Sequence, residues 1–165
     1  MFLNLFIAAE LRSKEEKIWL EVDYDDICPE QVKLMINQLS KALKVRRPYW
    51  ADGEANIEIN GEKVEVAAKA GYYTLKVNPG DYVILTFPIN YRLESTPDVS
   101  DIVSLGYGSY ILAALNSETE FLTLNELTEF EKTKNGLTFT HKGQEYKPLA
   151  QINHEAYHLY LKKQY

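Results

Sequence analysis

The sequence has little cysteine, and its basic residues are outnumbered by acidic ones. Cys28 is the single cysteine among 165 residues, which excludes an internal disulfide and is compatible with the cytoplasm. Lys and Arg number 18 against 24 Asp and Glu, so the formal charge is −6. This charge argues against general binding to nucleic acid or to an anionic membrane, and it leaves room for a basic partner.

Long apolar runs, repeats and low-complexity tracts are also missing. Glu10 and Arg12 end the apolar start "MFLNLFIAA" well short of a membrane span, and no basic residue precedes it. No stretch rich in Pro, Gly or Ser divides the chain, and no repeat period recurs. We therefore expect one globular domain over residues 1–165, located in the cytoplasm and without membrane contact.

What the chain does have is an ordinary globular composition with much tyrosine. Hydrophobic residues make up 45% and charged residues 25%, so a chain of this length can bury a core without disulfides or a structural metal. The 12 tyrosines combine apolar area with a hydroxyl group, which suits contact surfaces.

Much of the chain has the pattern of antiparallel strands. Residues 18–24 alternate between apolar and polar side chains, as a half-buried strand does. Asn60-Gly61 predicts a tight hairpin turn and Pro79-Gly80 predicts a type II turn. The run "YVILTF" that follows is almost wholly apolar and is typical of a central strand. We expect hairpins and meanders here and again over residues 127–149.

Helices are predicted in three places. Near residues 28–45, apolar side chains recur at helical spacing, Pro29 stands in the first turn, and basic residues gather at the far end. Residues 105–117 allow a short buried helix or a strand, and the alanine pair favours the helix. The composition from about residue 150 to the end is compatible with a helix. The predicted fold class is therefore α+β, with a mainly antiparallel sheet, an amphipathic helix near 28–45 and a C-terminal helix.

One short motif carries a possible chemistry. His154-Glu155-Ala156-Tyr157-His158 has the H-E-x-x-H spacing, which places two imidazoles on one face of a helix where both reach one zinc ion. In this respect the segment resembles the zincin metalloproteases. The resemblance implies that His154 and His158 are zinc ligands and that Glu155 is the general base.

The motif departs from the zincin pattern after His158. The remaining "LYLKKQY" contains no acid, histidine or cysteine, so a third ligand has to come from upstream. His141, on the apolar side of a predicted strand, is the candidate, since all three histidines lie in the last 25 residues. A lone histidine on such a face is more often a core or edge residue than a ligand.

Basic and aromatic residues meet at the end of the first predicted helix. Lys44, Arg46 and Arg47 precede Tyr49 and Trp50, a mixture that binders of single-stranded nucleic acid use. A helix C-terminus attracts bases through its dipole without any ligand, and the protein as a whole is acidic. The nucleic-acid interpretation needs these side chains to form one continuous face.

Three function classes follow. The leading hypothesis is a small cytoplasmic protein without a cofactor that binds another protein or assembles with itself, as an inhibitor, immunity protein or accessory factor does. Its basis is composition and the lack of a complete set of catalytic residues. The alternative is a zinc-dependent hydrolase that uses His154, Glu155 and His158, with His141 or an upstream acid completing the metal shell. Nucleic-acid binding is the third and the least supported.

Overall fold

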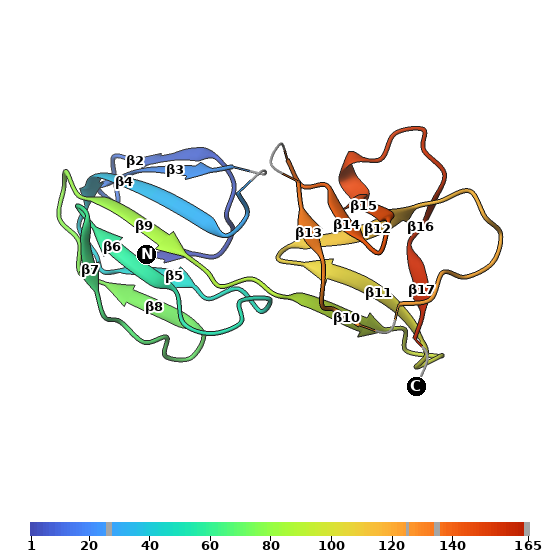
Figure 1. Cartoon of the computed structure of the whole chain (residues 1–165). Coiled ribbons are helices and arrows are strands. Elements are labelled where there is room, and N and C mark those ends of the chain that lie inside the picture. The colour runs from blue at the N-terminus through green and yellow to red at the C-terminus, as the bar shows by residue number, and fades with distance from the viewer. Residues whose placement is uncertain (26–27, 125, 134–135, 164–165) are drawn as a thin grey trace. The chain divides into compact units, whose positions relative to one another are not determined.

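The protein is built almost wholly from β-strands. The computed structural model describes residues 1–25, 28–124, 126–133 and 136–163. The chain divides into two compact units, Met1–Ile89 and Asn90–Tyr165 (Figure 1). In the described part of the chain, no helix is long and apolar enough to cross a membrane. The expectation of a single domain over residues 1–165 stays a prediction.

The first unit is a sandwich of two sheets (Figure 1, blue to green). A six-stranded sheet has the order β2-β3-β4-β9-β6-β7, and a three-stranded sheet has the order β1-β5-β8. All neighbours are antiparallel except β1 and β5, which are parallel. The strands are β1 (Phe2–Leu3), β2 (Ala9–Ser13), β3 (Ile18–Tyr24), β4 (Gln31–Leu39), β5 (Leu43–Arg46), β6 (Asn56–Ile59), β7 (Glu62–Val64), β8 (Tyr72–Leu75) and β9 (Tyr82–Thr86).

Alternation along the strands creates the core of this unit. Leu20 and Val22 of β3 are buried while Glu21 and Asp23, which alternate with them, are exposed, since successive side chains of a strand point to opposite faces. Aromatic side chains fill the space between the sheets. Phe87 is the centre of this group, which also contains Phe6, Trp50 and Tyr73.

The second unit contains one eight-stranded antiparallel sheet. The main order is β10-β11-β12-β15-β14-β13, with β16 paired to β12 and β17 paired to β11. Its own apolar core includes Leu105, Leu112, Phe139 and Leu161. The elements are β10 (Tyr91–Ser95), β11 (Ile102–Tyr107), β12 (Tyr110–Leu115), β13 (Glu131–Lys132), β14 (Phe139–His141), β15 (Gln144–Pro148), the 3-10 helix η1 (Leu149–Gln151), β16 (Tyr157–His158) and β17 (Tyr160–Lys162).

The predicted α+β class is wrong, because the described residues contain no α-helix. Residues 28–45, predicted as an amphipathic helix, form β4 and most of β5 instead. Val32, Leu34 and Ile36 are all fully buried, and this period of two fits a strand. The segment forms a strand and not a helix because β4 lies between β3 and β9, where an apolar strand is covered by the opposite sheet.

The other two helix predictions are also wrong. Residues 105–117 lie in the hairpin of β11 and β12, which turns at Gly108 with a positive φ of 56°. The predicted C-terminal helix from about residue 150 is replaced by the short η1, a loop, β16 and β17. Residues 157–162 gain their backbone hydrogen bonds from β12 and β11, so tertiary pairing overrides the local preference for a helix.

The turn predictions are confirmed. Asn60 and Gly61 have φ values of 55° and 83° and join β6 to β7, as a type I′ hairpin requires. Gly80 has a φ of 95°, and the amide of Asp81 donates to the carbonyl of Asn78 across Pro79-Gly80. The strand at residues 18–24 and the central position of β9 are confirmed as well.

Candidate functional site

The H-E-x-x-H segment does not form a helical face. His154 and Glu155 lie in the loop after η1, and His158 lies on β16, where it pairs with Ala114 of β12. The geometric premise of the motif, two histidines one helical turn apart, is therefore absent. The residues that have the H-E-x-x-H spacing instead form a loop followed by a short strand.

Glu155 stabilises its own loop. Its carboxylate accepts hydrogen bonds from the backbone amides of Asn153 and His154 at 3.0 and 3.1 Å, and the ammonium group of Lys147 lies 3.3 Å away. The hydrogen bond from Asn153 and its neighbouring amides, with help from Lys147, lowers the pKa of Glu155 from 4.5 to about 2. A carboxylate held in this way is suited to fixing a turn and is a weak proton acceptor.

The two remaining histidines have separate environments. The Nε2 of His158 lies 2.8 Å from the backbone oxygen of Glu118, and since a carbonyl only accepts, Nε2 is the donor. His141 is 7% exposed on β14, and its ring stacks on Phe130 with centroids 4.5 Å apart. The Nε2 of His141 has no hydrogen-bond partner among the described residues.

These placements bear on the predicted metal site. Within residues 1–25, 28–124, 126–133 and 136–163, no three His, Cys, Asp or Glu side chains form a group that could hold a metal ion. The helix on which the assignment depended is absent. The assignment of zinc to His154, His158 and His141, with Glu155 as general base, stays a prediction.

The basic and aromatic residues of segment 44–50 do not form one face. Trp50 is 8% exposed and packs against Phe87 in the core. The guanidinium of Arg47 donates to the carbonyls of Gly53 and Ala51 at 3.0 and 3.3 Å, so it holds the local loop together. The surface that the nucleic-acid interpretation requires is therefore not formed.

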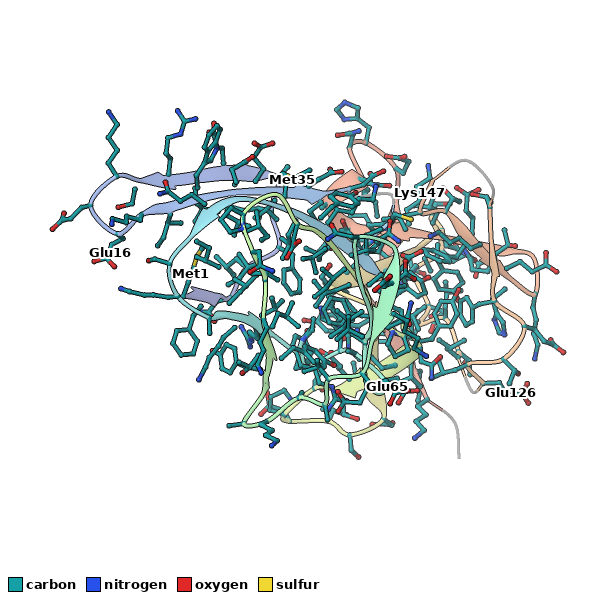
Figure 2. The ribbon with its side chains drawn as sticks, turned by 90° about the vertical axis from the view of Figure 1, so that its left-hand side faces the viewer. Met1, Glu16, Met35, Glu65, Glu126 and Lys147 are labelled. Atoms are coloured by element: carbon teal, nitrogen blue, oxygen red, sulfur yellow. The ribbon has the colours of Figure 1, made fainter. Side chains whose placement is uncertain are left out.

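A hollow with several charged side chains lies on the outer face of the six-stranded sheet of the first unit. It has a volume of about 570 Å³. Four neighbouring strands each contribute one side chain to a row across it, because Glu10 pairs with Glu21, Glu21 with Met35, and Met35 with Tyr82. Met35, labelled in Figure 2, is the apolar centre of this row. We call this hollow the outer-face site.

Local contacts occupy the charged groups of the outer-face site. Lys33 Nζ lies 3.7 Å from Asp23 Oδ2, and the amide of Asn37 donates to Glu21 at 2.7 Å. Glu10 pairs with Arg12 at 3.4 Å along the same strand. The result is an open sheet face with charged sides and an apolar and aromatic centre, which is suited to contact with another surface rather than to enclosing a small molecule.

Sequence reasoning did not find the outer-face site. The alternation that marks this outer face is present in β3 and β4, where the side chains between the buried ones are all partly or fully accessible. Because residues 28–45 were predicted as a helix, Lys33 and Met35 were not placed on the same sheet face as Glu21 and Tyr82. A correct strand assignment would have been needed before the row could be recognised.

Comparison with known proteins identifies a family for the first unit. Residues 1–89, the whole first unit, match the model of a family described as "Beta-L-arabinofuranosidase, GH127 middle domain". Comparison with curated proteins gives no match. The prediction of an inhibitor, immunity protein or accessory factor is therefore wrong, because the matching family is that of a glycoside hydrolase domain.

Solved structures share the fold across both units. The structure of a GH127 beta-L-arabinofuranosidase from Geobacillus stearothermophilus T6 matches with a TM-score of 0.68 at 18% identity, over 99% of this chain and 33% of that one. A GH127 beta-arabinofuranosidase matches with a TM-score of 0.65 at 20% identity, over 99% and 34%. A further glycoside hydrolase matches with a TM-score of 0.64 at 15% identity, over 94% and 34%. The chain thus spans about a third of the length of these structures.

Proposed function

Because the chain belongs to the GH127 beta-L-arabinofuranosidase middle-domain family, we propose that it is the β-sandwich part of a glycoside hydrolase that releases beta-linked L-arabinofuranose. The single observation that carries this proposal is the family match over residues 1–89. The proposal is supported by two enzymes of the same family, whose structures have a similar fold over 99% of the chain.

We assign the sandwich a supporting role rather than the acid–base chemistry. Glycoside hydrolysis ordinarily uses two carboxyl groups on either side of the scissile bond, and burial keeps one of them protonated. The carboxylates of the outer-face site, Glu10, Glu21 and Asp23, are all exposed. Each is also held by a neighbouring cation or amide, so none is placed as a general acid.

The length of the chain fits this role. It corresponds to 33% or 34% of the matching enzymes, so most of such an enzyme lies outside the part that it resembles. A rigid sandwich can fix the position of a second module that encloses the sugar, and precise positioning of reacting groups is worth several powers of ten in rate. The function proposed for this chain is that mechanical support.

Assaying the isolated chain tests the supporting role. We expect no release of nitrophenol from an aryl beta-L-arabinofuranoside above the rate of a heat-denatured control. If the chain alone hydrolysed the glycoside, and Glu10→Gln or Glu21→Gln abolished the activity, the outer-face site would be the active site. The same assay on a graft of the chain into a family enzyme tests whether it supplies what the enzyme needs.

A further inference from the structure

Strand β2 (Ala9–Ser13) forms an outer edge of the six-stranded sheet. It pairs on one side with β3, and the hairpin that joins the two strands has Glu16 at its tip (Figure 2). Its three central residues, Glu10, Leu11 and Arg12, are all exposed. An accessible edge strand offers a row of backbone donors and acceptors to another strand.

The side chains of β2 are self-complementary. Glu10 and Arg12 lie on the outer face of the sheet, on either side of Leu11. In an antiparallel pair of two identical strands centred on Leu11, each residue lies opposite the one that is equally far on the other side of the centre. Glu10 of one copy then lies opposite Arg12 of the other, twice, and Ala9 lies opposite Ser13. A two-fold axis through Leu11 therefore pairs every charge with its opposite.

We propose that two copies of this chain associate through β2, antiparallel about Leu11, to form one continuous sheet. The partner is a second copy, because the sequence Glu-Leu-Arg is complementary to itself only in this register. Single lysines at an edge strand discourage pairing, whereas opposite charges two residues apart favour one defined pairing.

Within one copy, Glu10 pairs with Arg12 of the same strand at 3.4 Å, and both side chains stay more than half exposed, at 52% and 56%. Glu10 lies directly opposite Glu21 on β3, and like charges at opposed positions repel. A strand added on the other side brings an arginine next to Glu10 and offsets this repulsion. The guanidinium of Arg12 lies 4.1 Å from the ring centroid of Trp19 on β3, which holds it on the outer face of the sheet.

The inner side of β2 is apolar. Leu11 is 36% exposed and borders a hollow of about 250 Å³ on this side. Leu5 and Ile7, exposed by 66% and 60%, line the same hollow with Phe2. Exposed large apolar side chains gathered at one place commonly mark an interface. Pairing about Leu11 brings the two Leu11 side chains together next to these hollows.

Two other edge strands in the described part of the chain, β7 and β10, do not have this combination. Strand β7 reads Glu62-Lys63-Val64, so a two-fold pair about Lys63 would place Glu62 opposite a valine. Strand β10 has Arg92 and Glu94 on either side of Leu93, but its arginine is more buried and more firmly held than Arg12. The Arg92 guanidinium is 21% exposed, lies over Gly106, and donates to the carbonyl of Gly108 at 2.6 Å, whereas the Arg12 side chain is 56% exposed.

Light scattering on chromatographed protein measures the assembly. At about 100 μM, where a dimer with a micromolar Kd is mostly assembled, we expect twice the chain mass of 19.0 kDa. Glu10→Arg alone and Arg12→Glu alone each place like charges opposite one another. Each should weaken the dimer by at least about tenfold in Kd.

Mixing the two variants tests whether the two charges pair with each other across the dimer. An equimolar mixture of Glu10→Arg and Arg12→Glu restores both opposite-charge pairs in a heterodimer, and the double variant restores them in a homodimer. We expect dimer mass in both cases. Glu62→Arg and Lys63→Glu on β7 are matched charge reversals at the opposite edge of the same sheet and should leave the dimer unchanged.

Three results would overturn the proposal. A monomer at every concentration excludes the dimer. A dimer insensitive to the β2 reversals, or variants that stay monomeric when mixed, exclude this surface and this register. If either charge variant fails to fold, as judged by tryptophan fluorescence, Leu11→Lys replaces it, since it places two like charges on the two-fold axis; a dimer that survives this change contradicts the proposal.

Discussion

Trp50 packs edge-on against Phe87, with the two ring centroids 5.7 Å apart and the planes at 80°. Phe87 also stacks on Phe6 and contacts Tyr73, so one ring connects the β8 strand, the N-terminal segment and the loop after β5. Aromatic pairs in this geometry stabilise beyond their buried area. Both tryptophans of the chain, Trp19 and Trp50, lie in the first unit, and their fluorescence therefore reports its folding separately.

Replacing Phe87 by alanine should strongly destabilise the first unit. The side chain is 1% exposed, and its removal leaves a cavity between the two sheets, which costs about 3–5 kcal/mol. Urea unfolding followed by tryptophan fluorescence measures the loss. Tyr49→Ala is the matched control, because Tyr49 is 73% exposed and should change stability by less than about 0.5 kcal/mol. Equal losses in the two variants would contradict the assigned core.

The hydroxyl group of Tyr73 should stabilise the first unit through its hydrogen bond with the amide of Ala55. It accepts from the backbone amide of Ala55 at 2.9 Å inside the sandwich. Tyr73→Phe removes the acceptor and keeps the ring, so we expect a loss of about 1 kcal/mol in the same urea experiment. In the neighbouring Tyr72→Phe, the lost bond to Asn4 is exposed, and a change below about 0.5 kcal/mol is expected. A larger loss for Tyr72→Phe would speak against this difference.

Acid should remove the contribution of Glu155 to stability. Its pKa in the folded protein is about 2 against an ordinary 4.5, since the amides of Asn153 and His154 and then Lys147 favour the carboxylate. The unfolded chain takes up the proton first, so the stabilisation is complete above about pH 4.5 and is lost as the pH falls to about 2. Glu155→Gln should be less stable than wild type near neutral pH, and urea unfolding should show this difference shrinking over that range. A difference independent of pH would refute the assigned charge.

Alkaline pH should act on the second unit through Tyr91. Burial, and then the neighbouring Tyr107, raises its pKa from 10.0 to about 12. The unfolded chain loses this proton first, so the stabilisation is complete below about pH 10 and is lost as the pH rises to about 12. Thermal unfolding should therefore decline less steeply over this range in Tyr91→Phe, which keeps the ring stacked on Phe130. Parallel declines for the variant and the wild type would contradict the prediction.

The strands and turns of this protein were more predictable than its fold class. Asn60-Gly61 and Pro79-Gly80 specify local backbone geometry, and the structure has both turns. Segment 28–45 was mispredicted because its apolar residues satisfy two periods at once. Val32 and Ile36 fit a helix as well as a strand, and Leu34 and the sheet neighbours of β4 decide between them. Pairing with distant strands is not visible in a local pattern.

The H-E-x-x-H segment was misassigned to a helix for a related reason. The H-E-x-x-H spacing carries its chemistry only on a helix, and the residues around His158 instead pair with β12. The row from Glu10 to Tyr82 joins residues that lie up to 72 positions apart, so it becomes visible only once the order of the strands is known. Sequence reasoning could identify which residues alternate, but it could not show which strands would lie side by side.

The most direct test of the account is the rate at which a grafted enzyme hydrolyses an aryl beta-L-arabinofuranoside. In the graft, this chain replaces the matching third of the Geobacillus stearothermophilus enzyme, and the control lacks that third. We predict a rate at least about tenfold above the truncated control, equivalent to about 1.4 kcal/mol of transition-state stabilisation. A soluble, folded graft that is no faster than the truncated enzyme would contradict the role of this sandwich in a glycoside hydrolase.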